Sequence, residues 1–127
     1  MISDRTFIEW ALRIGVFGTF LGHGIFALQH KPAWLHFLTF WGISTESSWT
    51  MMTAIGVIDV FIAGITLLRP NRAVLLYAAC WAFATALMRP VAGGFFLDFV
   101  ERAANWAAPL ALYFWLRYQE AAISAKK

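Results

Sequence analysis

The sequence has few charged residues and almost no cysteine, and both shortages narrow the class of protein. Lys, Arg, Asp and Glu make up 13% of the 127 residues, against about 25% in a soluble globular domain. A single cysteine excludes a scaffold of disulfide bonds within the chain. Apolar side chains are abundant instead, at 61% of the residues, with 12 Phe and 7 Trp among them. A soluble domain of this length cannot bury that much apolar surface, so the composition predicts an integral membrane protein.

The basic residues do not form the patch that a nucleic-acid-binding protein requires. Ten Lys and Arg exceed seven Asp and Glu and give a net charge of +3. They are scattered singly, however, and most of them lie between the apolar runs. Basic loops beside membrane spans account for this pattern, and we expect no nucleic-acid partner.

Four apolar segments have the composition of membrane spans. A bilayer core about 30 Å thick requires roughly 20 apolar residues per helix, and the segments lie at about residues 7–28, 50–68, 73–88 and 103–120. We expect the first to be a span rather than a secretory signal peptide, because Glu9 interrupts its start and no small-residue cleavage site follows. The sequence therefore predicts a single transmembrane domain over residues 1–127, an all-α integral membrane four-helix bundle.

Two of the connections are apolar but too short to cross a bilayer. Residues 33–43 and 94–100 are rich in aromatic side chains, which favours short helices in the membrane interface. Ordinary loops packed on the bundle are the alternative. Both connections follow an odd-numbered span, so we expect them on the same, outer side of the membrane, where they would form a lid.

The distribution of basic residues predicts the orientation of the bundle. Four spans place both termini on one side, together with seven basic residues, whereas Lys31, Arg89 and Arg102 lie on the other side. Basic residues accumulate in cytoplasmic loops, so we expect both termini in the cytoplasm. The seven residues are Arg5, Arg13, Arg69, Arg72, Arg117, Lys126 and Lys127.

Small residues indicate where the helices would touch. Lipid provides no hydrophobic drive between helices, so close packing of small side chains holds them together. The first span offers Gly15, Gly18 and Gly22, of which the last two form a GxxxG pair. In the second span, Met52, Gly56, Asp59, Ala63 and Thr66 follow one seam. Because Asp59 lies on this seam, we expect it to face protein rather than lipid.

Two polar residues lie well inside the predicted spans. Asp59 is nine residues from either end of its span, where an acidic side chain costs about 2.5–3.5 kcal/mol. It either makes hydrogen bonds to neighbouring helices or binds or protonates something polar within the membrane. His23 likewise either bridges two helices or serves as a proton donor and acceptor, oriented by Asp59 if the two helices touch.

The other candidate residues lie toward the outer side. Arg89 ends the third span before Pro90, which we expect to stop the helix, and it either reaches the interface or faces a cavity. Asp98 and Arg102 have the spacing of a pair on one helix face. A cavity opening outward would be ringed by polar residues and roofed by tryptophans. The candidate set is His23, Asp59, Arg89, Glu101, Asn105, Trp34, Trp41 and Trp106.

We expect neither haem nor a metal ion. A bis-His haem needs two histidines on facing spans, but only His23 lies well inside one. The three histidines also lack a metal-binding spacing. Glu9 and Arg13, four residues apart, are interpreted as a structural pair, and Cys80 as a small core residue.

Three motifs together resemble the DoxX-like family of four-helix membrane proteins, which is related to the small subunit of thiosulfate:quinone oxidoreductase. They are RIGVFGTFLGHGIFAL in the first span, GVIDVFIAGITLLRPNRA around Asp59, and a Trp-x-x-Pro motif from Trp106 to Pro109. The resemblance covers nearly the whole chain, although Asp59 stands where it leads us to expect Glu. It implies a bacterial inner-membrane protein linked to redox or quinone chemistry, often beside a soluble or membrane-bound partner.

These observations lead to one functional hypothesis and two alternatives. The protein would bind a lipophilic redox molecule, an exchangeable quinone, in its outer half, as a subunit or accessory of an oxidoreductase. Its expected partners are membrane lipids, an oxidoreductase subunit and a second copy of the chain. One alternative is a non-catalytic assembly or scaffold subunit. The other is a small proton-coupled transporter with Asp59 as proton relay, which would need a homo-oligomer to form a path.

Overall fold

The computed structural model describes residues 3–126, and over this range it consists of six α-helices and contains no strand. Four helices are long: α1 (Asp4–Leu28), α3 (Thr45–Leu68), α4 (Arg72–Val91) and α6 (Ala103–Ser124). Two short helices, α2 (Pro32–Thr39) and α5 (Phe96–Val100), occupy the apolar connections. The prediction of an all-α fold is confirmed. Lys127, one of the seven basic residues, lies outside the described residues.

Three of the long helices, α1, α3 and α4, are long and apolar enough to cross a membrane. They have 25, 24 and 20 residues, which matches the roughly 20 residues that a bilayer core requires. Large apolar side chains are exposed on their outer faces, for example Phe7 on α1 and Phe61 on α3. Such a surface is stable in lipid rather than in water, so the chain is a membrane protein.

Side-chain caps start three of the long helices earlier than the apolar segments alone predict. The hydroxyl of Ser44 accepts a hydrogen bond from the N–H of Ser47 at 3.2 Å, and α3 begins at Thr45 instead of residue 50. Ser3 caps α1 and Asn71 caps α4 in the same way. A capping oxygen satisfies a backbone N–H at a helix start that has no partner within the helix. Polar residues can therefore join the first turn.

The end of α4 corrects one expectation. Pro90 does not stop the helix, which continues to Val91. The helix ends instead because Gly93 adopts a left-handed φ of 91°, which lets the N–H of Gly94 donate to the carbonyl of Arg89 at 2.8 Å. Proline only removes its own hydrogen bond, and the last helical turn tolerates this loss.

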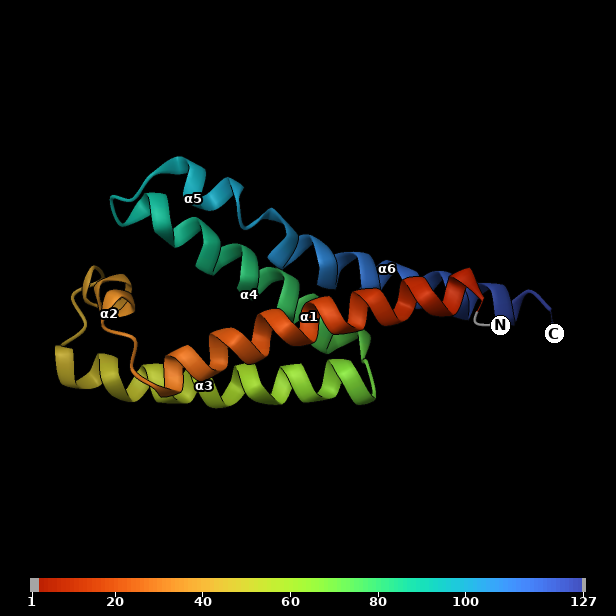
Figure 1. Ribbon diagram of the computed structural model, residues 1–127, viewed down its shortest axis with the longest axis horizontal. Helices are drawn as coiled ribbons and strands as arrows, with labels where there is room; N and C mark the ends of the chain where they lie inside the picture. The colour runs from red at the N-terminus through yellow and green to blue at the C-terminus, as the bar shows by residue number, and fades with distance from the viewer. Residues whose placement is uncertain (1–2, 127) are drawn as a thin grey trace.

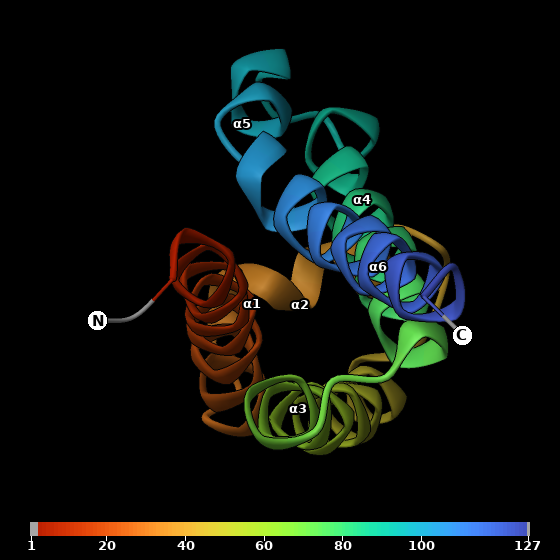
Figure 2. The same cartoon turned by 90° about the vertical axis from the view of Figure 1, so that its right-hand side faces the viewer.

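Two helix pairs form the bundle. α1 packs along α3 and α4 packs along α6, while α1 also contacts α6 and α3 contacts α4 only sparsely. The pairs are close together at the end of the molecule where both termini lie, which we call the terminal end (Figure 1). They diverge toward the opposite end, the open end, which carries α2 and α5. A view along the bundle shows α2 lying between the two pairs (Figure 2).

The pair α1–α3 is closest where Gly24 faces Gly56. A Cβ atom on Gly56 would lie 2.8 Å from the carbonyl oxygen of Gly24, which no real side chain tolerates without movement of the backbone. The prediction that Gly15, Gly18 and Gly22 form the contact is wrong, because the space around each is open. At 3.6 residues per turn, Gly22 and Gly24 lie on nearly opposite sides of α1.

Apolar residues, half of them alanines, fill the centre of the bundle. Val16, Phe20, Ile62, Ala63, Ala78 and Ala82 form its buried core. On α3, Met52, Gly56, Asp59, Ala63 and Thr66 are all buried, so Asp59 faces protein as expected. Cys80 does not belong to the core as interpreted from the sequence, because it is exposed on the outer face of α4.

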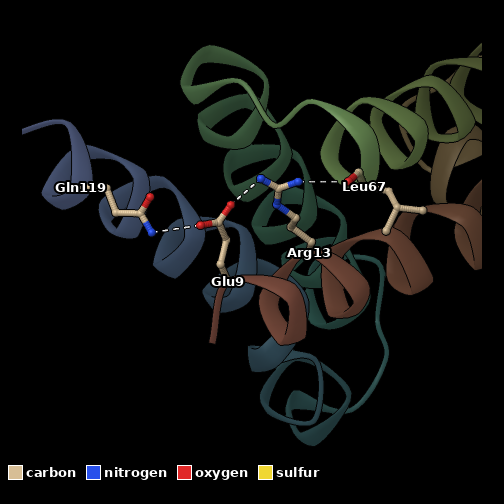
Figure 3. A network of polar contacts seen from close by, with 4 residues as sticks. All are labelled: Glu9, Arg13, Leu67 and Gln119. Carbon is tan, nitrogen blue, oxygen red and sulfur yellow. Dashed lines mark hydrogen bonds and ion pairs between the residues drawn. The ribbon is translucent and has the colours of Figure 1, made fainter. Parts of the chain in front are cut away.

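A polar network joins three helices at the terminal end (Figure 3). Arg13 pairs with Glu9 on α1, and its Nη1 donates to the carbonyl of Leu67 in the last turn of α3 at 3.3 Å. The amide of Gln119 on α6 donates to the other oxygen of Glu9 at 2.9 Å. The pair of Glu9 and Arg13 is therefore structural, and it supports the contact of α1 with both α3 and α6.

Candidate ligand-binding site

A cavity of about 260 Å³ lies toward the open end, between the two helix pairs. Five helices line it, and α2 covers it with Trp34, Phe37 and Leu38. The volume falls just below the range of about 300–1,000 Å³ that is typical of small-molecule sites. The space therefore suits a single ring or a small polar head group. The lining residues are His23, Ala27, Trp34, Phe37, Leu38, Trp41, Met52, Ile55, Asp59, Trp81, Ala82, Thr85, Met88, Arg89, Arg102 and Asn105.

The fold brings six of the candidate residues to this cavity although they are far apart in the sequence. His23 comes from α1, Asp59 from α3, Arg89 from α4 and Asn105 from α6. Trp34 lies on α2, and Trp41 follows α2 in the connection to α3. The six residues are His23, Trp34, Trp41, Asp59, Arg89 and Asn105.

The other two candidates, Glu101 and Trp106, do not line the cavity. The side chain of Glu101 is exposed and forms an ion pair with Arg102. Trp106 packs against the core, with its ring centroid 5.5 Å from that of Phe83. Its indole N–H is buried without a hydrogen-bond partner among the described residues. The roof therefore contains Trp34 and Trp41 but not Trp106.

Arg102 lines the cavity although sequence reasoning assigned it elsewhere. We expected its side chain to pair with that of Asp98 on one helix face. Instead, Nη1 of Arg102 donates to the backbone carbonyl of Asp98 at 2.7 Å, and the side chain pairs with Glu101. The expectation was wrong because α5 ends at Val100 and α6 begins at Ala103, so the two residues do not share a helix.

Trp81 and Thr85 also line the cavity and were not among the candidates. Their spacing contained a usable signal: Trp81, Thr85 and Arg89 follow one another at intervals of four residues. Residues at this interval lie on the same face of a helix. Arg89 was a candidate for the cavity. Its place at the end of this row therefore indicates that Thr85 and Trp81, one and two turns before it, face the same cavity.

Asp59 carries the most unusual environment in the cavity. Its side chain is buried, with 3% of the residue exposed, and its Oδ1 has no hydrogen-bond partner within residues 3–126. The indole of Trp81 approaches the carboxyl group from α4. His23 is not hydrogen-bonded to Asp59 in the described part of the chain; its ring instead meets the edge of Trp34, with centroids 5.6 Å apart. The carboxyl oxygen is therefore available to a ligand.

Two arginines lie nearer to the open end. The guanidinium carbon of Arg89 is 5.2 Å from the centroid of Phe37, a cation–π contact that joins α4 to α2. Nε of Arg89 is buried and has no partner within the described residues. Arg102 lines the same cavity. Hydrogen-bond donors at this end and a carboxyl group deeper in the bundle give the cavity two polar ends, separated by aromatic walls.

The roof helix α2 is attached to both helix pairs. Nε2 of His36 donates a hydrogen bond to the carbonyl of Ala92, which follows α4, at 2.9 Å. At the other side, His30 precedes α2 and its Nε2 lies 2.7 Å from the hydroxyl of Thr53 on α3. No residue of α2 is buried, so these contacts and the aromatic ones hold it in place.

The fold and the cavity define an all-helical membrane protein with a partly polar cavity between two helix pairs. Within the described residues, no group of three or more His, Cys, Asp or Glu side chains is arranged to hold a metal ion. Comparison of the chain with protein-family models, with curated proteins and with solved structures finds no match. The resemblance to the DoxX-like family stays a prediction.

Proposed function

We propose that this protein binds a quinone, a lipophilic redox molecule, in the cavity and serves as a subunit or accessory of an oxidoreductase. The unpartnered carboxyl oxygen of Asp59 supports this most strongly. A buried polar atom without a hydrogen bond costs about 1–3 kcal/mol. A ligand that hydrogen-bonds to this oxygen when it occupies the cavity would offset the cost.

The arrangement of the other groups favours a ring with oxygen atoms at opposite positions. Trp34, Phe37 and Trp81 provide aromatic contacts for a flat ring. Asp59 and Arg89 both line the cavity and each has a buried polar atom without a partner among the described residues, so we expect Asp59 to meet one oxygen and Arg89 the other. The hydroxyl group of a reduced ring would donate a hydrogen bond to Asp59. His23 also lines the cavity and can accept or donate a hydrogen bond.

We further propose that α6 is a fourth span and that both termini lie in the cytoplasm of a bacterium, with the protein in its inner membrane. α6 has 22 residues and packs along α4. Both termini lie at the same end of the molecule (Figure 1). Arg5 lies in the first turn of α1, Arg69 directly after α3 and Arg117 in the second half of α6. Basic residues at one end favour a cytoplasmic location for that end.

Binding of a short-chain quinone analogue to the purified protein tests the site. Asp59→Asn and His23→Ala should each weaken binding by about tenfold or more, since a buried polar group of the ligand left without a hydrogen bond costs about 1–3 kcal/mol. Glu46→Gln is the matched control, because Glu46 is exposed at the start of α3 and does not line the cavity. Quenching of Trp fluorescence reports binding, and circular dichroism checks the fold. Unchanged affinity in both cavity variants would contradict the site.

The same buried carboxyl group also favours a second candidate, a proton-coupled transporter in which Asp59 is the proton relay. Uptake into proteoliposomes would then depend on a proton gradient and would be lost in Asp59→Asn. Binding of the quinone analogue without gradient-dependent uptake supports the first proposal. A tightly bound protein partner with an empty cavity would instead indicate an assembly subunit.

A further inference from the structure

We propose that the ligand of the cavity carries a long apolar chain, which lies in a groove between α3 and α4 and reaches the bilayer there. The inference rests on the proposed function, because it requires a head group in the cavity. The groove, which we call the α3–α4 groove, is lined by Ile58, Phe61, Ile62, Ile65, Ala73, Val74 and Tyr77. It is a depression distinct from the cavity, and it is lined by residues of these two helices alone.

The groove adjoins the cavity along the same two helices. On α3, the cavity residue Asp59 is followed by the groove residue Ile62, and Ile58 lies beside it. On α4, the cavity residue Trp81 lies one turn from the groove residue Tyr77, and their rings stack with centroids 6.5 Å apart. The two spaces share no lining residue, but they adjoin along α3 at Asp59 and Ile58 and along α4 at Trp81 and Tyr77, without an intervening helix.

The chemistry of the two spaces is complementary. The cavity contains all of the charged side chains of the two spaces, namely Asp59, Arg89 and Arg102. The groove is lined by aliphatic and aromatic side chains, and Tyr77 supplies its one polar group. A molecule that occupies both spaces must have a polar head and an apolar chain. It must also be flexible enough to bend past the stacked rings of Tyr77 and Trp81.

The groove is open to the surroundings of the bundle. Phe61 is 67% exposed and Tyr77 is 47% exposed, and α3 and α4 make few contacts with each other. From Ile58 to Ile65 the groove follows α3 for about 10 Å, at 1.5 Å per residue. A chain of at least this length lies against protein on one side and against lipid on the other. The open groove gives a membrane-dissolved ligand a lateral path to the cavity, beneath the roof helix.

The chain gains little energy from the groove itself, because lipid is as apolar as these side chains. Its importance is steric. Once the head group is seated, the chain must leave the cavity, and the α3–α4 groove is an apolar surface that adjoins it. Filling the groove should therefore exclude ligands with a chain while leaving chainless ligands unaffected.

Two probes with the same head group test the inference: a benzoquinone with a decyl chain and the same ring with a methyl group instead. Ala73→Trp places a large side chain in the groove, since Ala73 is exposed and lines it. Ala84→Trp is the control, because Ala84 is exposed on the same helix and lines neither space. We expect Ala73→Trp to weaken binding of the decyl probe about tenfold or more, with the methyl probe and the control variant within about twofold of the unmodified protein.

A photoreactive group at the end of the decyl chain locates the chain directly. Labelling of residues 58–65 or 73–77, lost in Ala73→Trp, supports the inference. Equal decyl-probe affinity in Ala73→Trp and Ala84→Trp, or labelling confined to α2 and α6, overturns it, and the groove is then covered by ordinary lipid or another protein. If neither probe binds the unmodified protein, the proposed function fails and the inference fails with it. Binding of the methyl probe alone overturns only the inference.

Discussion

At Gly24 and Gly56, a hydrogen atom in place of a side chain sets the distance between α1 and α3. A Cβ atom on Gly56 would lie 2.8 Å from the carbonyl oxygen of Gly24 and 2.9 Å from the backbone nitrogen of Leu28. Backbone atoms cannot move aside as a flexible side chain can. The helices would have to separate, and the walls of the cavity that His23 and Asp59 provide would separate with them.

Gly56→Ala should therefore destabilise the protein by about 1–3 kcal/mol, which is typical of overpacking. Gly18→Ala is the matched control, because the space around Gly18 is open. Alanine is the better helix former by about 1 kcal/mol, so this variant should be as stable as the unmodified protein or slightly more stable. Thermal unfolding in detergent, followed by circular dichroism, measures both. Equal loss in the two variants would show that α1 and α3 are not in close contact at Gly56.

Among the elements, the roof helix α2 covers the cavity although it has little burial of its own. It has eight residues, none of them buried, and one hydrogen bond from His36 joins it to the end of α4. His36→Ala removes this bond, worth about 0.5–1.5 kcal/mol, and should increase hydrogen exchange in residues 32–39. His36→Gln should preserve protection, because its amide nitrogen can take the place of Nε2. If both variants exchange like the unmodified protein, the bond does not hold the roof.

The polar network at the terminal end joins α1, α3 and α6 through partly buried groups. Arg13→Ala leaves Glu9 without its ion pair and the carbonyl of Leu67 without its donor. We expect a loss of about 1.5–3 kcal/mol in unfolding free energy, the range for hydrogen bonds to charged groups. Arg72→Ala, which removes an exposed pair with Glu120, should have a smaller effect because solvent screens exposed charges. A larger loss in Arg72→Ala would contradict the structural role of the network.

For the whole molecule, the position of the termini depends on whether α6 crosses the membrane. With four spans, residues 3 and 124 lie on one side and residue 92 on the other. Ser3→Cys, Ser124→Cys and Ala92→Cys, each made in a Cys80→Ala background, report this through labelling with a membrane-impermeant thiol reagent. We expect the first two to react only after the membrane is opened and Ala92→Cys to react in intact cells. Labelling of Ser3→Cys and Ser124→Cys from opposite sides would exclude four spans.

Much of the cavity could be anticipated because its polar residues are costly in lipid. Asp59, His23 and Arg89 stand out in apolar runs, and such residues face protein or a cavity. Arg102 was missed because Asp98 offered it a local partner in the sequence. Trp81 and Thr85 were missed because only their four-residue spacing to Arg89 marks them. The prediction of which glycines of α1 contact α3 was also wrong. Gly15, Gly18 and Gly22 form the more regular pattern, but they lie on the open side of α1. Which face of a helix meets its neighbour depends on both helices.

The sequence by itself determined that the protein lies in a membrane, where its helices form and which polar residues are unfavourable in contact with lipid. Each of these follows from transfer free energy and local backbone preference. Only the tertiary structure decided which helices pair, where the pairs diverge and which side chains share the cavity. The close approach of Gly24 and Gly56 and the roof position of α2 depend on contacts between segments far apart in the chain. Such contacts follow from the shapes of two packed surfaces, and no single segment encodes both.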